Sequence, residues 1–559
     1  MALRIPSKRR VRRPMPKIRV ISPGGGLNLL VSDSHIKDKE ASDLNNIAFV
    51  EDGAVTKRGG HTPVGSGLTT IPKGLGVLYT STLRRLLTID DTKLKYLLAN
   101  TWTEITGASF TTGQAVNFCQ VQDSIAICNK DQTIAKYDGT TLSRPTTAPK
   151  AAFSIYYNGY HIASGVANKP DRIYISTTTD PFDFTNAAGT LSTEPEVPGA
   201  STFAGTGANF IDVGAGDGDK VTALSKFQDM LVIFKERSIF KMTFDSSGTP
   251  VLAPITNTMG AVAHKSVDNV ENDIFYLSRN GFYVLGNEPN YIVIRTNELS
   301  QRVHPFIENI TPANLPETAC IYSDFVFYAS VPYGGTAYNN RLLNYDRRYL
   351  SWSRGDSVDT NAWCEYVDDS NAKHLYYASD SEPEVYEVTT SYNDNGEAID
   401  AYWASKAFDA GEFEIYKHWI DVTLLFRLVS GTVDVAVISD TGEVIASSAV
   451  TSVQDLIGTV GYDTFGDYLV GGDISTTTGT GPQTNNVPYR LDINKDSRTI
   501  KVRVSNNVIN ETFTLLGFIV TYRPYSHYQF PSSQRLPAIA AAVPATAIVT
   551  ESGDYVILE

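Results

Sequence analysis

The sequence predicts a mainly β protein that combines a β-propeller-like domain, an antiparallel β-sandwich domain and an extended, basic N-terminal arm. Three observations predict this fold class. Tyr, Phe, Gly and Pro are plentiful, at 30, 24, 42 and 26 residues, and these residue types favour pleated strands and frequent turns. Short apolar strands recur over residues 74–392, and longer strands with strict alternation follow over 396–523.

The chain is too long for a single hydrophobic core. It has 559 residues, whereas single cores stop growing beyond roughly 250–300 residues, so at least two domains are expected. Charged residues make up 19% of the chain, which argues against long disordered stretches. No apolar run is long enough to span a membrane, and no apolar segment follows the basic N-terminus, so neither a membrane span nor a secretory signal is expected.

Residues 24–73 are expected to form a platform segment ahead of the first domain. It opens with a glycine-rich turn. Over 40–50, Leu44 and Ile47 belong to an apolar set at roughly helical spacing, and Asp38 precedes it as a candidate N-cap. The pattern therefore predicts one short helix in this segment.

Residues 74–392 repeat a loose unit of about 40 residues, in which several short strands are separated by turn signals. One such unit places strands at 115–119, 124–128 and 134–138. This spacing is typical of a propeller blade, and six or seven units fit the region. No WD or kelch signature accompanies the repeat, so a stack of ordinary β-sandwiches stays open as the alternative.

Residues 396–523 change character. Strands such as 419–426 and 432–438 alternate apolar and polar positions, as in an antiparallel sandwich with one solvated face. A loop insert rich in Gly and Thr, 453–487, interrupts the domain. The extended C-terminal tail, 524–559, has too few large apolar residues for a core of its own and is expected to add as a strand to a neighbour's sheet edge.

Charge is unevenly distributed between the N-terminal arm, residues 1–23, and the rest of the chain. The net charge is −14, yet the first twenty residues contain no acid. Without the basic residues of the arm, 39 basic residues face 61 acidic ones, a net charge of −22 for residues 21–559. The basic residues of the arm are Arg4, Lys8, Arg9, Arg10, Arg12, Arg13, Lys17 and Arg19.

An acidic body disfavours a globular nucleic-acid reader, which would present a basic face. The arm itself has three interpretations: it contacts DNA phosphates, it orders against an acidic ring of neighbouring protein, or it is a solvated tail. Four prolines keep it extended, which suits threading between subunits better than reading a groove. We therefore expect these residues to contact a protein partner or DNA.

No motif for catalysis, cofactor binding or metal binding is found, so no residue is expected to have such a role. The four cysteines form no CxxC pair and are interpreted as buried small hydrophobic residues of a chain folded in a reducing cytosol. The eight histidines show no HxxxH or HExxH spacing, and no GxSxG motif nominates a serine nucleophile. Paired carboxylates of a glycosidase remain open, because their separation is a three-dimensional quantity.

The segment from Gly214 to Val221 superficially suggests a phosphate loop. It lacks GxxxxGK[ST], because Lys220 is followed by Val221. Asp217 and Asp219 would be candidate calcium ligands, but no EF-type spacing or distal Glu follows them. The segment is therefore interpreted as a hairpin loop.

Several segments, taken in order over about residues 22–425, resemble one family. They are Gly25–Asn28, Glu40–Asn46, Glu51–Val55, Lys57–Gly60, Asp171–Ser176, Gly216–Phe240, Phe275–Tyr283, Leu343–Asp346 and Lys406–Gly411. Together they resemble the tail nozzle or hub proteins of short-tailed bacteriophages, the tail tubular protein B-like family. The insert 453–487 and the C-terminal tail match nothing in that family.

The resemblance implies a structural virion protein, not an enzyme, assembled in the cytoplasm of a bacterial host. It implies a homo-hexameric ring below the adaptor and portal, which closes the exit channel, docks tail fibres and conducts DNA during ejection without sequence recognition. Two other functions stay open: a receptor- or glycan-binding tail spike or fibre that binds through the 396–523 sandwich, and another head–tail connector component. A polysaccharide-degrading enzyme is a third class.

Overall fold

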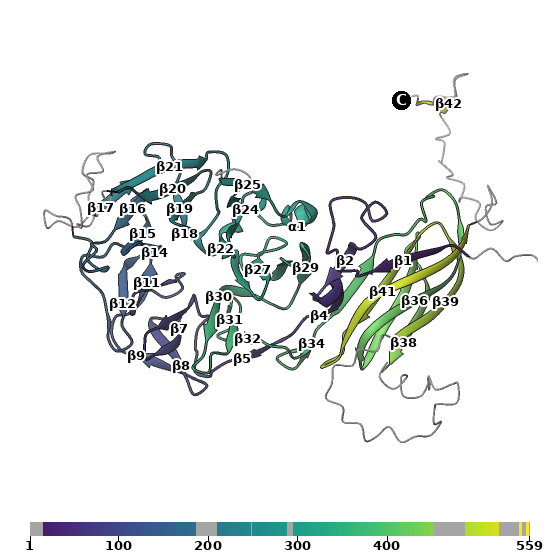
Figure 1. Cartoon of the computed structure of the whole chain (residues 1–559), viewed down its shortest axis with the longest axis horizontal. Coiled ribbons are helices and arrows are strands. Elements are labelled where there is room, and N and C mark those ends of the chain that lie inside the picture. Colours follow the sequence, from purple (N-terminus) through teal and green to yellow (C-terminus); the bar gives the residue numbers. More distant parts are fainter. Residues whose placement is uncertain are drawn as a thin grey trace, which may run out of the picture.

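The computed structural model describes residues 15–185, 209–246, 249–287, 294–451 and 487–524, together with two short strands near the C-terminus. In Figure 1 a disc of short strands lies on one side of the molecule and a sandwich of long strands on the other. The fold class is therefore mainly β, as predicted. The one α-helix of the described residues, α1 (His304–Ile307), is a single turn, so no described helix is able to cross a membrane.

The disc is a β-propeller whose described part contains seven blades of four antiparallel strands each, and the sheet of the seventh blade continues into a short hairpin, Asn393–Ala398. Blades 1 to 4 follow one another along the chain. They contain β6 (Leu75–Tyr79), β7 (Arg84–Asp90), β8 (Lys93–Leu98) and β9 (Thr101–Ile105); β10 (Asn117–Val121), β11 (Ser124–Asn129), β12 (Gln132–Tyr137) and β13 (Leu142–Ser143); β14 (Phe153–Tyr157), β15 (Tyr160–Val166), β16 (Lys169–Ile175) and β17 (Asn209–Asp212); and β18 (Val221–Phe227), β19 (Met230–Lys235), β20 (Ile239–Phe244) and β21 (Pro250–Thr256).

Blades 5 and 6 continue the series, and blade 7 takes its fourth strand from the N-terminal part of the chain. They contain β22 (Val267–Val270), β23 (Asp273–Ser278), β24 (Gly281–Asn287) and β25 (Ile294–Glu298); β26 (Ala319–Ser323), β27 (Val326–Val331), β28 (Arg341–Asp346) and β29 (Ser351–Gly355); and β30 (Thr360–Val367), β31 (Lys373–Ser379), β32 (Val385–Val388) and β5 (His61–Pro63). Single 3₁₀ turns lie at Glu51–Gly53, His264–Ser266, Gln301–Val303 and Leu315–Glu317.

The ring is closed. The first strand of each blade contacts the first strand of the next, in the order β6, β10, β14, β18, β22, β26, β30 and back to β6. Pairing of β5 with β32, Thr62 opposite Glu387, ties the beginning of the chain to the last blade. The hairpin between β14 and β15 is tight because its two turn residues tolerate a left-handed backbone. Asn158 and Gly159 both adopt positive φ, as a type I′ turn requires.

The second domain is a sandwich of two antiparallel sheets, and both ends of the chain contribute strands to it. In the first sheet the strands lie in the order β3 (Ile47–Val50), β4 (Ala54–Lys57), β41 (Thr512–Pro524), β36 (Lys417–Ser430) and β39 (Val487–Ser497), and β1 (Lys17–Ile21) also pairs with β41. The second orders β2 (Ala41–Asn45), β35 (Ala401–Ser405), β40 (Ile500–Asn506), β37 (Thr432–Ser439) and β38 (Val444–Thr451). The propeller is thus an insertion within the sandwich.

The helix predicted over 40–50 was wrong. These residues form β2 and β3, with a break at Asn46, which adopts a φ of 54°. The apolar residues spaced like a helix face instead bury against two different strands, because Leu44 lies opposite Trp403 and Ile47 opposite Lys57. The segment 24–73 is likewise not a separate platform: it gives three strands to the sandwich and one to the propeller.

One continuous hydrophobic core joins the two domains. Its buried members include Phe282 and Trp352 of blades 5 and 6 together with Leu44, Trp403 and Phe518 of the sandwich. Apolar surface buried across the junction contributes roughly 25 cal/mol per Å² to holding the domains in one orientation. The two domains therefore share one core across their junction.

A buried ion pair clamps the point where the chain passes between the domains. Arg58 Nη1 and Nη2 donate to the two carboxylate oxygens of Asp394 at 2.9 and 2.6 Å, and Arg58 Nε donates to Asn46 Oδ1 at 2.8 Å. Asp394 belongs to a small hairpin, β33 (Asn393–Asp394) with β34 (Glu397–Ala398), in the segment that leaves the propeller. The clamp therefore joins the incoming and outgoing connections.

Two glycines let these connections touch. A Cβ on Gly59 would lie 2.2 Å from the carbonyl oxygen of Thr389, and one on Gly60 would lie 1.7 Å from that of Asn393. Any side chain here would force the two connections apart. The Lys57–Gly60 segment is thus explained by close backbone approach at the junction.

Candidate functional site

The main cavity of interest is the mouth of the propeller's central channel. Each blade begins with its innermost strand, so the N-terminal ends of these strands meet at one end of the channel. There the residues before and at the start of β6, β10, β22, β26 and β30 surround a polar cavity of about 580 Å³. That volume lies within the roughly 300–1,000 Å³ of small-molecule sites.

Three lysines stand at this mouth and two of them are paired. Lys265 Nζ lies 2.9 Å from Glu317 Oε2, and Lys73 Nζ lies 3.3 Å from Asp380 Oδ1. The third, Lys130 in the turn between β11 and β12, is exposed and has no hydrogen-bond or ion-pair partner within the described part of the chain. Three cations and two anions leave one excess positive charge.

Asn361 supplies an unfilled acceptor to the same cavity. This residue is only 7% exposed, and its Nδ2 donates to the carbonyls of Pro72 and Ser379 at 2.6 and 2.9 Å. Its Oδ1 has no partner among the described residues. A buried acceptor without a donor costs about 1–3 kcal/mol, so this oxygen favours any group that brings an O–H or N–H to it.

Aromatic side chains complete the lining. Phe118 lies against the glycine backbone of β6, where a Cβ on Gly76 would come within 2.3 Å of its ring. His264 stacks on Phe153 with ring centroids 4.8 Å apart, and burial lowers the pKa of His264 to about 4. The imidazole is therefore neutral at pH 7, and the lysines alone give the mouth its positive charge. Trp363 forms the wall toward the domain junction.

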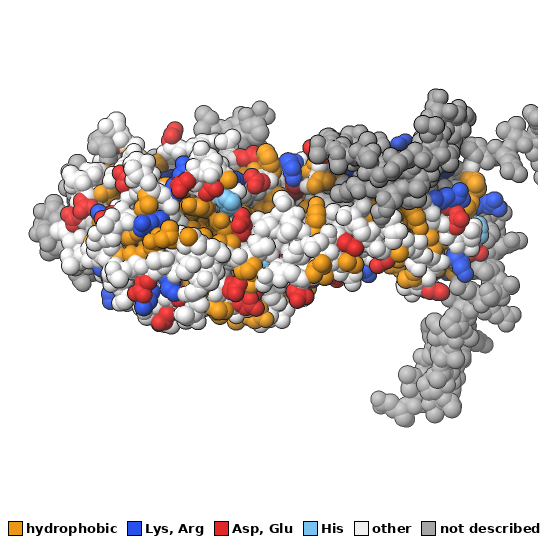
Figure 2. Space-filling view, turned by 90° about the horizontal axis from the view of Figure 1, so that it is seen from below, with side chains coloured by type: hydrophobic (Ala, Val, Ile, Leu, Met, Phe, Trp, Pro, Cys, Tyr) orange, Lys and Arg blue, Asp and Glu red, His pale blue; other side chains and the backbone are white. Residues whose placement is uncertain are grey.

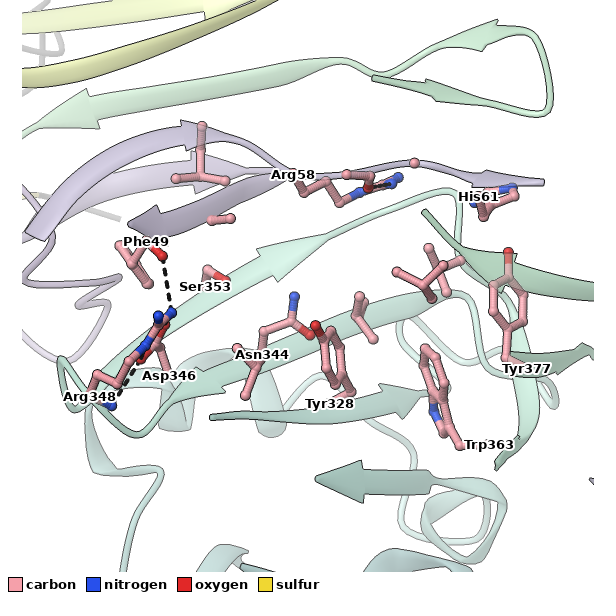
Figure 3. A pocket seen from close by; sticks show the side chains of 18 residues that line it. Phe49, Arg58, His61, Tyr328, Asn344, Asp346, Arg348, Ser353, Trp363 and Tyr377 are labelled. Carbon is pink, nitrogen blue, oxygen red and sulfur yellow. Dashed lines mark hydrogen bonds and ion pairs between the residues drawn. The ribbon is translucent and has the colours of Figure 1, made fainter. Parts of the chain in front are cut away.

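A second, smaller cavity lies on the other side of Trp363, between blades 6 and 7 and the junction (Figure 3). Its volume is about 170 Å³, and Tyr328, Tyr377 and Arg58 line it with apolar neighbours. Asn344 Oδ1 and Trp363 Nε1 have no partner among the described residues. The cavity is below the size of a ligand site and has room and polar groups for ordered water.

The loop from Gly214 to Asp219 is built around a lysine. Lys235 is fully buried, and its ammonium donates to the carbonyl of Val213 at 2.8 Å and to both carboxylate oxygens of Asp217 at 2.7 and 2.6 Å. Asp219 accepts hydrogen bonds from the backbone N–H groups of Glu236 and Arg237. Both carboxylates therefore hold the fold of blade 4.

Two of the cysteines and one histidine are strongly shielded from solvent. All four cysteines are free thiols, and burial raises the pKa of Cys128 and of Cys364 to about 12, so neither forms a thiolate near neutral pH. Burial lowers the pKa of His161 to about 4, and its Nδ1 lies 3.0 Å from the carbonyl of Pro181. Within the described residues no group of His, Cys, Asp and Glu has the arrangement of a metal site.

The structure describes two of the eight basic residues of the arm, and both lie on the sandwich. Lys17 and Arg19 are exposed residues of β1 at the sandwich, where Arg19 lies opposite Ile519 of β41. Arg4, Lys8, Arg9, Arg10, Arg12 and Arg13 lie outside the described residues, as does most of the insert 453–487. In the C-terminal tail, β42 (Ala547–Val549) pairs with β43 (Tyr555–Ile557).

Sequence reasoning did not find the channel-mouth residues. Lys73, Lys130 and Asn361 are unremarkable in the sequence, and they meet only because the propeller closes. A signal exists once the blades are aligned: Lys73 and Lys265 each stand two residues before an innermost strand.

Comparison with known proteins gives similarity of architecture only. No protein-family model and no curated protein matches the chain. Among solved structures, the computationally designed Ika8 protein has 11% identity and a TM-score of 0.32 over 65% of this chain and 98% of its own. The WD40 propeller domain of Doa1 has 8% identity and a TM-score of 0.33 over 60% and 97%, and YCF48 bound to D1 peptide has 10% and 0.34 over 62% and 99%. The propeller is established by the strand pairing of this chain itself.

Proposed function

We propose that this chain is a non-enzymatic structural protein of a bacteriophage virion, a subunit of the ring-shaped nozzle or hub of a short tail. In this role it forms a homo-hexamer, docks the adaptor or portal-side ring and the tail fibres, and closes the exit channel. Genomic DNA then passes through the lumen during ejection without sequence recognition.

The observation that supports the proposal is the packed junction between propeller and sandwich, with its shared core and buried ion pair. Two segments of the family resemblance, Gly25–Asn28 and Lys57–Gly60, lie at this junction, where Gly26 lies against the backbone of Trp352, Gly60 against that of Asn393, and Arg58 makes the clamp. A subunit that carries mechanical load needs its domains fixed in one orientation. The shared core and the clamp provide this, since moving one domain would expose apolar surface and a buried charge pair.

Charge supports a lumen that DNA crosses without sticking. Residues 21–559 carry a net charge of −22, and acidic walls repel phosphates. On the face shown in Figure 2, acidic and basic side chains are interspersed among hydrophobic ones, without a continuous basic stripe over the described residues. The idea fails if the residues that face the lumen of the assembled ring prove net basic.

The test is the mass and symmetry of the purified full-length chain, alone and with an adaptor ring. Mass photometry and negative-stain class averages should give six-fold rings, or a monomer that becomes six-fold when the adaptor ring is added. A stable free trimer would contradict the nozzle and favour a receptor-binding spike.

A second candidate function is a receptor- or glycan-binding tail protein. The channel mouth favours it, because a polar cavity of about 580 Å³ with an unfilled acceptor and an unpaired lysine is suited to a small polar ligand. In this function the propeller binds the ligand. The sandwich, which was expected from its sequence to bind the receptor, instead attaches the protein to the tail.

A further inference from the structure

We propose that the channel mouth binds a carboxylate-bearing sugar, such as a uronic acid unit of a surface polysaccharide. This inference rests on the second candidate function and names its ligand class. It does not depend on the hexameric ring. The groups that carry it are Lys130, Asn361, Gln114, Asn117 and Phe118, which all line one cavity.

The carboxylate of the ligand is matched by the lysines. Lys130 is available, because no described residue pairs with it, while Lys73 and Lys265 each keep an acidic partner. In a chain whose net charge is −14, an excess positive charge inside a concave site is a local exception. An anionic group entering the mouth exchanges water for charge-assisted hydrogen bonds.

The hydroxyls of the ligand are matched by the amides. Asn361 Oδ1 is a buried acceptor that needs a donor, and Asn117 accepts only the backbone N–H of Ser154 at 3.3 Å through its Oδ1. The carboxamides of Asn117 and Gln114 offer further donors to the same cavity. A carboxylate alone brings only acceptors, so a ligand that fills Asn361 Oδ1 must also bring an O–H or N–H group, which the hydroxyl groups of a sugar provide.

The ring of the ligand is matched by an aromatic surface. Phe118 and Trp363 line the cavity, and the backbone of Gly76 holds the Phe118 ring in place. The C–H face of a sugar ring is apolar and packs on such side chains. The polar rim and the aromatic wall together favour an acidic sugar, whose hydroxyl groups match the rim and whose apolar C–H face matches the wall.

The experiment is saturation-transfer difference NMR and titration calorimetry on the full chain with D-glucuronate, D-glucose and inorganic phosphate. Glucuronate should bind, and D-glucose should bind at least tenfold more weakly. Lys130→Gln should weaken glucuronate binding about fivefold to tenfold, because one charge-assisted hydrogen bond at an open rim is lost. Gln114→Ala should weaken it by a smaller factor.

Lys226→Gln is the matched control. Lys226 is an exposed lysine near the end of the innermost strand β18, away from the mouth, and it should leave binding unchanged. The proposal is overturned if glucuronate gives no transfer, if phosphate displaces it at equal concentration, or if Lys130→Gln and Lys226→Gln bind alike. Melting temperatures within about 2 °C of the wild type would confirm that the variants are folded. A surface substitution changes the free energy of unfolding by only about 0.5 kcal/mol. Loss of glucuronate binding in a six-fold ring overturns this inference alone, and binding by a free trimer overturns the nozzle alone.

Discussion

Replacing Arg58 by methionine should destabilise the junction between propeller and sandwich. Arg58 and Asp394 are almost buried, with side chains 10% and 7% exposed, and their shortest N–O distance is 2.6 Å. Methionine fills much of the volume but leaves the Asp394 carboxylate without its guanidinium. His61 Nδ1, 3.1 Å from Asp394 Oδ1, is the neighbour that remains.

The expected loss follows from the burial of the pair. Removing one partner of a buried ion pair costs about 3–5 kcal/mol, because the other charge is left uncompensated. Arg58 Nη2 also donates to the carbonyl of Asp356 at 3.1 Å, and that acceptor loses its partner too. For a cooperative unit of about 150–250 residues this corresponds to a melting temperature lower by about 6–20 °C.

The loss should depend on pH in a defined direction. Burial alone would raise the pKa of Asp394, but the neighbouring His61 imidazole and Arg58 guanidinium outweigh it and hold the pKa below its ordinary value. A depressed carboxyl pKa stabilises the fold above the unfolded value near 4, and this stability disappears as pH falls through the folded value. The difference between Arg58→Met and the wild type should therefore shrink as pH falls from 7 toward 3.

The assay is calorimetry and urea unfolding at several pH values, with limited proteolysis of the segment that joins β32 to β35. Arg427→Met is the matched control, since Arg427 pairs with Glu51 and Asp52 at the surface, and the side chains of these partners are 90% and 76% exposed. An exposed pair is worth about 0–1 kcal/mol. The reasoning is refuted if Arg58→Met destabilises no more than Arg427→Met, or if the double variant Arg58→Met, Asp394→Asn loses the full sum of the two single effects.

Three further predictions concern buried groups. Lys235→Met should lower the free energy of unfolding by about 2–4 kcal/mol, because Asp217 loses its ammonium partner. Calcium or a chelator should leave the wild-type melting temperature unchanged, and a calcium-dependent shift would show that the loop binds a metal ion. Burial lowers the pKa of His161 to about 4, so as pH falls the unfolded chain takes up this proton before the folded chain does. The free energy of unfolding should therefore fall by about 3 kcal/mol between pH 6.5 and 4. His161→Gln should remove this pH dependence in urea titrations. Cys128 and Cys364, whose pKa values burial raises to about 12, should resist iodoacetamide at pH 7.5 until urea unfolds the chain, and rapid labelling of the native protein would show that they are accessible.

Local patterns in the sequence were enough to predict the fold class. The alternation of 419–426 and 432–438 places one face in a core, and these residues indeed fall in β36 and β37. Repeated short strands with turn residues predicted a propeller of six or seven units, and the described structure has seven blades. Both signals are local, since each strand's own residues and its tight turn carry them.

The prediction of a helix at 40–50 was wrong because the same apolar spacing fits either one helix or two short strands. Leu44 and Ile47 lie at helical spacing, yet Leu44 is on β2 and Ile47 on β3. The decision came from strand β35, more than 350 residues later, which offered β2 an edge to pair with. No short window of sequence contains that partner.

The sequence by itself therefore determined the strand-rich composition, the blade repeat and the acidic body with its basic arm. Only the tertiary structure decided that both chain ends build the sandwich, that β5 closes blade 7, and that Lys73, Lys130 and Asn361 share one cavity. The physical reason is that strand pairing and ring closure depend on backbone groups and surfaces far apart in the chain, whose free energy of association appears only when the whole fold brings them together.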